Sequence, residues 1–282
     1  MKTGLMVLAV ALLSGACAKK AGPDIQFYGS QNKFVQTEKG AFGGEPAIEN
    51  SFVMVDGVMT SFFDPNALGM MKRRNMVTLE TKLVLGSNAR FSYVIEHAGQ
   101  LLNFVTIGNS IHRMTSTDGG LTWSQAVQIL PGTMTQWNPG VVVDASGKWH
   151  MLVEADETGL PNQGGVACYY YTSNDGDTWV SHGKVIEKCG NPYLAATSRG
   201  IVVIHGDIAG GFWQTTASTL TGTTWATHRE KFVIGTPGVH VCDPHAIETN
   251  GKIILSVSVD QNSITMTEAT DTFESLHERL LQ

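Results

Sequence analysis

The chain has 282 residues and a formal net charge of −6, and only 16% of its residues are charged. Its longest basic cluster is Lys72-Arg73-Arg74, so nucleic-acid binding has little electrostatic support. The 31 glycines and the lack of a long amphipathic helical pattern favour many short strands joined by turns. The length allows one large all-β domain or two small domains.

The N-terminal residues have the pattern of an export signal. Lys2 supplies a positive charge, and the apolar run from Leu5 to Leu13 is short for a membrane span. The residues up to Cys17 resemble a bacterial lipoprotein signal, which implies cleavage before Cys17, lipidation of Cys17 and a tether at residues 17–24. Ordinary cleavage after Ala18 is the alternative. Both predict an exported protein, either a membrane-anchored lipoprotein or a secreted or periplasmic one.

A repeat organises the rest of the chain. The pairs Asn138-Pro139, Asn191-Pro192 and Asp243-Pro244 lie 53 and 52 residues apart, and an apolar stretch, a Gly turn and a second apolar stretch follow each pair. Two earlier units, from near Glu49 and near Arg90, fit less closely. A constant period near fifty residues indicates a propeller. We therefore predict a five-bladed β-propeller with four-stranded antiparallel blades, formed by residues 25–282 as a single domain.

Two segments are candidates for closing the ring. Residues 24–47 could supply a strand that pairs with the last blade. The tail from Phe273 to Arg279 is the other candidate, and it has mild helical character.

Three cysteines follow Cys17. They are Cys168, Cys189 and Cys242, so at most one disulfide can form among them. Because no Cys-x-x-Cys spacing occurs, a zinc site built on thiolates is not expected.

A turn motif occurs in phase with the repeat. Residues 116–123 read Ser-x-Asp-x-Gly-x-Thr-Trp, residues 173–179 repeat the motif one residue shorter, and residues 218–225 keep it without the Asp. Short Ser and Asp side chains can bond the backbone of a tight turn, and Gly accepts positive φ. The motif resembles the Asp-box, or BNR repeat, of sialidases and related propellers. That resemblance implies a structural role, so Asp118 and Asp175 are not expected to be catalytic.

The number of repeats changes the resemblance. Five units with Asn-Pro or Asp-Pro starts look more like the five-bladed glycoside hydrolases of the arabinanase and β-xylosidase type than like six-bladed sialidases. This resemblance implies a carbohydrate substrate and O-glycosyl hydrolysis in a pocket at the mouth of the central tunnel. The first strand of each blade starts at this mouth, and the second strand ends there.

Glycoside hydrolysis requires two carboxyl groups, one protonated and one ionised. We expect Glu154 to be the general acid, because burial at the end of an apolar strand raises a carboxyl pKa. Asp243 is the expected base or nucleophile. The related enzymes use a third carboxylate, for which Asp156, Asp207 and Asp64 are candidates.

The chain departs from the family pattern in the first blade. The related hydrolases have the base Asp where the first blade starts, and this chain has Glu45 or Glu49 there. Glu154 lies in a polar stretch, Glu154 to Gly159, which could instead be a solvated loop.

Further residues at the blade starts are candidates for binding substrate: Glu49, Arg90, Trp137, Asn138, Asn191, Tyr193 and His245. No cofactor or metal is expected, although the resemblance raises the idea of an axial calcium ion near His245. A buried tunnel histidine with satisfied hydrogen bonds is the alternative interpretation.

Two other functions remain open. The chain could be a non-catalytic glycan-binding or adhesion protein at the cell surface, or a structural component of an envelope or tail assembly. Asn at two blade starts favours binding, because an amide can bond a sugar but cannot act as a base. The expected partners are a carbohydrate and, through a lipid anchor alone, a membrane; we expect a monomer that binds no nucleic acid.

Overall fold

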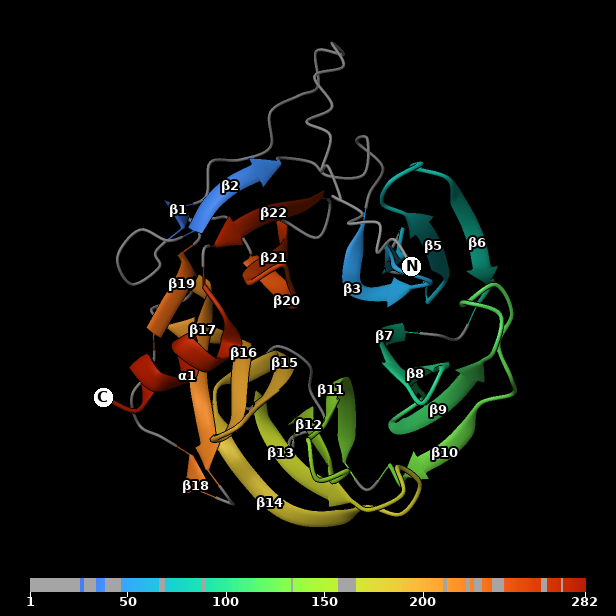
Figure 1. Ribbon diagram of the computed structural model, residues 1–282. Coiled ribbons are helices and arrows are strands. Elements are labelled where there is room, and N and C mark those ends of the chain that lie inside the picture. Colours follow the sequence, from blue (N-terminus) through green and yellow to red (C-terminus); the bar gives the residue numbers. More distant parts are fainter. Residues whose placement is uncertain are drawn as a thin grey trace, which may run out of the picture.

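The structure is a computed structural model that describes residues 26–27, 34–38, 47–65, 69–87, 90–132, 134–156, 166–209, 212–221, 224–225, 230–234, 241–259, 263–269 and 271–282. Its strands form five antiparallel sheets arranged around a common centre (Figure 1). The innermost strands of the five sheets are β3, β7, β11, β15 and β20.

Three of the sheets each consist of four strands that are consecutive in the chain. They are β3 (Ile48–Val55), β4 (Val58–Asp64), β5 (Met71–Asn75) and β6 (Thr81–Leu85); β7 (Arg90–His97), β8 (Gln100–Ile107), β9 (Ser110–Ser116) and β10 (Val127–Leu130); and β11 (Thr135–Val143), β12 (Trp149–Asp156), β13 (Val166–Ser173) and β14 (Val180–Glu187).

The other two sheets each include a strand from near the N-terminus. One has six strands: β15 (Cys189–Thr197), β16 (Gly200–Ala209), β17 (Phe212–Thr221), β18 (Thr224–Trp225), β19 (Glu230–Ile234) and β1 (Gln26–Phe27). The last has four: β20 (Val241–Thr249), β21 (Lys252–Val259), β22 (Ser263–Ala269) and β2 (Phe34–Glu38).

The prediction of an all-β propeller with four-stranded antiparallel blades is confirmed, but four such blades are present and not the five predicted. Four sheets have four strands, and the sheet that begins with β15 has six. The reason is the ten-residue strand β17, which is long enough to pair with both β18 and β19, while β1 adds to the edge of β19.

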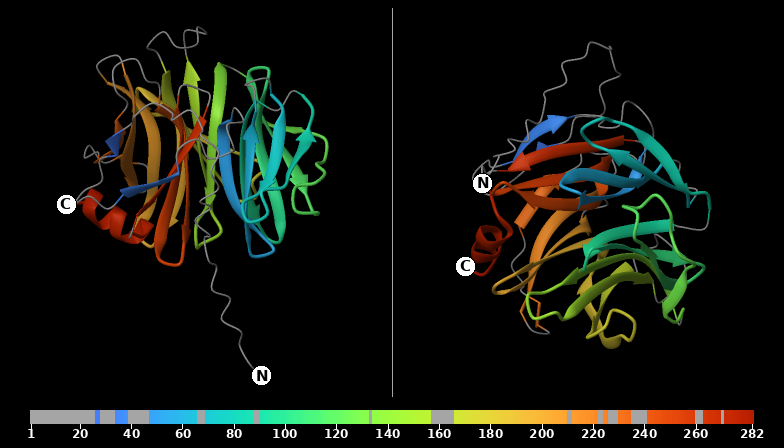
Figure 2. Two further views of the ribbon diagram at one scale, coloured as in Figure 1. Left: turned by 90° about the horizontal axis from the view of Figure 1, so that it is seen from above. Right: turned by 45° about the vertical axis from the view of Figure 1, so that its right-hand side comes forward.

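The ring closes through β2. Phe34 pairs with Ala269 and Gln36 with Thr267, which makes β2 the outermost strand of the last sheet. The closing strand therefore comes from the first of the two candidate segments. The tail forms α1 (Phe273–Leu280) instead, which contacts β15, β16 and β17 at the periphery of the propeller (Figure 2).

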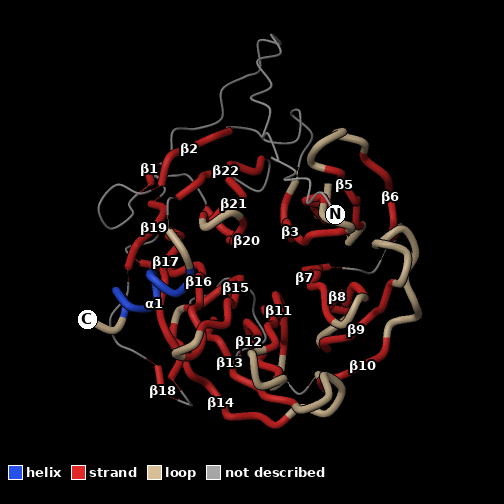
Figure 3. The backbone as a smooth tube through the Cα atoms, viewed as in Figure 1, coloured by secondary structure: helices blue, strands red, loops and turns tan. Residues whose placement is uncertain are grey.

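Burial follows the position of each strand in its sheet. All eight residues of β12 and all eight of β13 are buried, whereas most of the outer strand β14 is not. A central strand that neighbouring sheets cover on both faces has no side toward solvent, so all of its consecutive residues are buried. Loops and turns lie at the two ends of the strands, as the tube in Figure 3 shows.

The two described boxes form turns stabilised by their own side chains. Ser116 Oγ donates to Asp118 Oδ1 (2.8 Å), and the same oxygen accepts from the amides of Leu121 and Thr122 (3.0 Å each). These bonds hold the pKa of the Asp118 carboxyl well below its ordinary value. Asp118 is thus committed to its turn, which agrees with a structural role.

Each box also contacts the preceding sheet. Arg73 on β5 donates to the Gly119 carbonyl (2.8 Å), and Arg113 on β9 donates to the Gly176 carbonyl (3.2 Å). A side chain at Gly120, which has φ of +84°, would place its Cβ 2.4 Å from Phe62 Cζ. The boxes therefore join neighbouring blades near their outer hairpins.

Candidate active site

The same backbone feature occurs where each sheet begins. Five residues with positive φ, called the start residues here, are Glu49 (+53°), Phe91 (+57°), Asn138 (+43°), Asn191 (+47°) and Asp243 (+49°). Each coincides with a register shift between the first and second strands of its sheet. Bulges of this kind redirect side chains and are frequent beside functional sites.

The start residues surround one small pocket, called the mouth pocket here. Its lining consists of the start residues and the one or two residues after each: Glu49, Asn50, Ser51, Phe91, Ser92, Tyr93, Asn138, Pro139, Asn191, Pro192, Asp243, Pro244 and His245. The predicted blade starts are therefore correct at four places, and the second lies at Phe91, one residue after Arg90.

A belt of hydrogen bonds links the start residues around the pocket. The Phe91 amide donates to Glu49 Oε2 (2.7 Å), and the Glu49 amide donates to Asp243 Oδ2 (3.3 Å). The Asn191 side-chain amide donates to Asp243 Oδ1. Because four sheets contribute, the belt stabilises the mouth as one unit.

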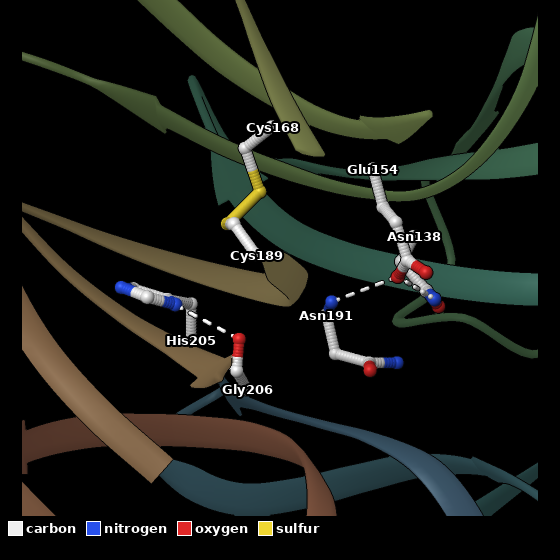
Figure 4. The surroundings of a disulfide bond; sticks show 7 residues. All are labelled: Asn138, Glu154, Cys168, Cys189, Asn191, His205 and Gly206. Atoms are coloured by element: carbon white, nitrogen blue, oxygen red, sulfur yellow. Dashed lines mark hydrogen bonds between the residues drawn. A yellow bond between two sulfur atoms is a disulfide. The ribbon is translucent and has the colours of Figure 1, made fainter. Parts of the chain in front are cut away.

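Glu154, near the end of β12, also belongs to the belt, because it accepts hydrogen bonds from two of the start residues. Its Oε2 accepts from the Asn138 side-chain amide (2.7 Å) and from the Asn191 backbone amide (3.0 Å) (Figure 4). Glu154 is not one of the residues that line the mouth pocket, but it bonds two that do. Asn191 thus connects the carboxyl groups of Glu154 and Asp243, and the backbone amide of Glu49 connects Glu49 to Asp243.

The environment of Glu154 favours its protonated form. Burial raises its pKa to about 7, the hydrogen bonds from Asn138 and Asn191 act in the opposite direction, and the charges of Asp243 and Asp156 raise it further. The exposed fraction of Glu154 is 5%. This carboxyl group can exchange a proton near neutral pH, which a general acid requires.

The environment of Glu49 also favours its protonated form. Burial raises its pKa well above the ordinary value, the charges of Asp243 and Asp64 add to that effect, and the Phe91 amide opposes it. Glu49 lines the mouth pocket directly. It therefore has the character of an acid, beyond the substrate-binding role that its position predicted.

His245 lies at the inner end of the mouth pocket as a neutral side chain. Burial lowers its pKa to about 3, and its Nδ1 accepts from the Phe52 amide (3.2 Å). The proton of the neutral ring must then be on Nε2, a buried atom with no hydrogen-bond partner among the described residues. Because neither nitrogen offers a free lone pair, His245 does not fit an axial calcium ion as a direct ligand.

A collar of three rings lies on the axis below the mouth pocket. The ring centroids of Tyr93 and Tyr193 lie 5.2 and 4.8 Å from that of His245, and 6.3 Å from each other. A second and larger cavity is lined by the same three residues. Tyr193 lines only this second cavity, so the structure places it deeper than a residue at the mouth.

Other predicted site residues lie away from the mouth pocket. Arg90 is exposed, with its guanidinium 5.7 Å from the Phe91 ring centroid, and Trp137 is partly buried outside the lining. Asp156 is fully buried two residues beyond Glu154. Asp64 accepts from the Gly69 amide (2.7 Å) and lies close enough to Glu49 to raise its pKa.

Three candidates lie outside the described side chains. They are Cys17, Glu45 and Asp207, although the backbone of Asp207 pairs with Cys189 in β16.

The sequence interpretation missed five pocket residues besides the prolines. They are Asn50, Ser51, Phe91, Ser92 and Tyr93. Asn50 donates to Ser256 (2.8 Å) and accepts from Ser61. Aligning the Asn-Pro and Asp-Pro pairs with Glu49-Asn50 and Phe91-Ser92 would have identified three of the five positions, because the starts differ in side chain but share the bulge.

No family model matches the sequence, and no curated protein matches it. Solved structures are similar to it in fold. An endo-arabinase from Bacteroides thetaiotaomicron superposes with a TM-score of 0.62 and 10% identity, over 81% of this chain and 95% of that one. A β-1,2-mannobiose phosphorylase from Listeria innocua gives 0.59 and 12% identity, over 92% and 100%.

A GH43 endo-arabinanase from Bacillus licheniformis is also similar, with a TM-score of 0.51 and 16% identity over 67% of this chain and 74% of that one. At these identities the similarity concerns the fold alone. It supports the resemblance to propeller glycoside hydrolases, and a sialidase-like specificity is not confirmed. The chain therefore has the β-propeller fold found in these carbohydrate-active proteins.

Proposed function

We propose that this protein hydrolyses glycosidic bonds at the mouth pocket. The observation that carries the proposal is a group of three carboxyl groups at one pocket: Glu49 and Asp243 line it, and Glu154 bonds two of its lining residues. Two of them have raised pKa values. A protonated acid beside an ionised carboxylate is the combination that glycoside hydrolysis requires.

Glu154 acts as the general acid in this proposal. With a pKa of about 7 it donates a proton to the oxygen of the leaving sugar and recovers it near neutral pH. Asp243, which lines the pocket, acts on the opposite side of the bond, either activating a water molecule or attacking the anomeric carbon. Asp156, Asp207 and Asp64 are the candidates for tuning the acid. The separation of the two catalytic carboxyl groups determines which stereochemical outcome follows.

Substrate binding falls to polar residues of the mouth. Asn138, Asn191 and His245 line the pocket, and Arg90 and Trp137 lie near the starts of their strands. The named activities of the similar structures, on arabinan and on β-1,2-mannobiose, support a carbohydrate as the ligand.

We further propose a five-bladed exported protein, with the six-stranded sheet as the fifth blade and a lipid on Cys17 as the membrane anchor. The disulfide between Cys168 and Cys189 supports export, because disulfides persist in oxidising compartments. A membrane-spanning helix is not found among the described residues.

Sugar release tests the proposed activity. The protein from residue 18 onward would be incubated with polysaccharides and aryl glycosides, beside the variants Glu154→Gln, Asp243→Asn and Glu49→Gln. We expect the first two changes to reduce release at least about 100-fold, as loss of acid–base catalysis does. Release that survives Glu154→Gln but not Glu49→Gln would make Glu49 the acid.

Non-catalytic glycan binding is the second candidate function, and the belt favours it. Glu49, Glu154 and Asp243 already accept hydrogen bonds from neighbouring amides, as residues with a structural role would. Retention on an immobilised glycan without any release would support this candidate and contradict hydrolysis.

A further inference from the structure

A disulfide joins two neighbouring sheets close to Glu154. Cys168 on β13 and Cys189 on β15 are bonded, with Cα atoms 5.3 Å apart, and both residues are fully buried. The two strands belong to different sheets, so the disulfide crosses the seam between them (Figure 4). Such a link restricts separation of the two sheets at that point.

Each cysteine lies on a strand that contacts Glu154. Cys168 is the cross-strand partner of Glu154 in the register of β12 and β13, so the two side chains project from the same face of the sheet. Cys189 precedes Asn191 by two residues, and the Asn191 amide donates to Glu154 Oε2 (3.0 Å). One covalent bond therefore connects the strand beside Glu154 to the strand that supplies its hydrogen-bond donor.

The seam is narrow where this occurs. A Cβ on Gly140 of β11 would lie 2.0 Å from the Pro192 carbonyl of β15, so the two innermost strands are in backbone contact. Asn191 itself has φ of +47° and lies at the bulge between β15 and β16. Close contact between the sheets keeps water away from the Glu154 carboxyl group and keeps the Asn191 amide within bonding distance.

We propose that the Cys168–Cys189 disulfide positions Glu154, by holding β15 against β12 so that the Asn191 amide stays on the carboxyl group and the seam stays dry. The two cysteines are positioning residues, because they act through Glu154 and not on a substrate. The consequence for catalysis rests on the proposed function, but the effect on Glu154 is independent of any activity.

Titration of the Glu154 carboxyl group tests the proposal without a substrate. The carboxyl ¹³C resonance would be followed by NMR in the wild-type protein and in the double variant Cys168→Ala/Cys189→Ala, with Glu154→Gln to assign the signal. The wild-type midpoint should lie near 7. Because burial is the largest cause of the raised pKa, opening the seam should lower the midpoint by at least about one unit, a tenfold change in acidity. A midpoint that stays at the wild-type value overturns the proposal.

Loss of a disulfide also lowers overall stability, so a matched control is needed. Leu276→Ala removes a buried side chain from α1, away from the mouth, and should lower the thermal midpoint while leaving the Glu154 titration unchanged. If the double variant does not fold, Cys168→Val with Cys189→Ala refills part of the space and takes its place.

Sugar release separates this proposal from the proposed function. A shifted titration in a protein that releases no sugar keeps the positioning role and rejects the hydrolase. Sugar release together with an unchanged titration keeps the hydrolase and rejects the positioning role.

Discussion

At the scale of the residue, Glu154 links proton binding to folding. Its pKa is about 7 in the folded protein and near the ordinary value when unfolded, so the native state binds more protons between about pH 4.5 and 7. Protonated Glu154 therefore stabilises the native state at low pH, and this stabilisation is lost as the pH rises from about 4.5 to 7. Glu49, with its pKa raised as well, acts in the same direction.

We therefore expect the wild-type protein to lose more free energy of unfolding between pH 5 and pH 8 than Glu154→Gln does. The difference between the two proteins should be about 2.5 kcal/mol, because most of the pKa shift of roughly 2.5 units takes effect between pH 5 and pH 8. Urea unfolding at the two pH values measures it. Parallel pH dependence in the two proteins would show that Glu154 is not held protonated by burial.

Sequence reasoning was effective for those residues whose chemistry is set locally. Burial of Glu154 at the end of an apolar strand was sufficient to predict a raised pKa. Glu49 could not be predicted in the same way, because its pKa is raised first by its burial in the folded ring and then by the charge of Asp243, which lies 194 residues away in the chain. Phe91 was missed because its start has neither Pro nor a polar side chain.

At the scale of the element, the box turns combine a backbone requirement with a packing requirement. Gly120 has positive φ and lies against Phe62, whereas Gly108 has positive φ with nothing within 4 Å of an added Cβ. Comparing substitutions at the two glycines therefore separates the free-energy cost of the left-handed backbone from the cost of the contact with Phe62.

Gly120→Ala should lower the free energy of unfolding by about 2–4 kcal/mol, through left-handed backbone strain and overpacking against Phe62. Gly108→Ala should cost about 1 kcal/mol, because only the backbone term applies. Chemical denaturation of both variants provides the comparison. Equal losses would mean that the box glycine does not serve contact between blades.

The boxes and the Asn-Pro spacing identified the strands because their signals recur at a fixed interval. The six-stranded sheet could not be predicted in this way. β18 and β1 have two residues each, and they are strands only because β17 and β19 offer edges to pair with.

At the scale of the whole molecule, the ring depends on pairing between distant parts of the chain. β2 is the outermost strand of the last sheet and the partner of β22. Without it, β22 would present unpaired backbone groups at a sheet edge.

Deleting residues 1–39 should lower the thermal midpoint by about 5 °C or more, since a five-residue strand contributes about 2 kcal/mol and each kcal/mol corresponds to about 2–4 °C at this size. Deleting residues 1–24, which keeps both β1 and β2, is the matched control and should have little effect. Calorimetry on the two truncated proteins distinguishes them. If both melt together, the ring does not depend on β2.

The five start residues also make the mouth pocket asymmetric. Four of them carry a polar side chain, Glu49, Asn138, Asn191 and Asp243, and the remaining one carries Phe91. The polar groups thus form a horseshoe whose open side is an aromatic ring. A sugar has a hydroxyl-rich edge and an apolar C–H face, so a ring bound here would enter in one orientation, with its hydroxyls toward the horseshoe and its C–H face toward Phe91.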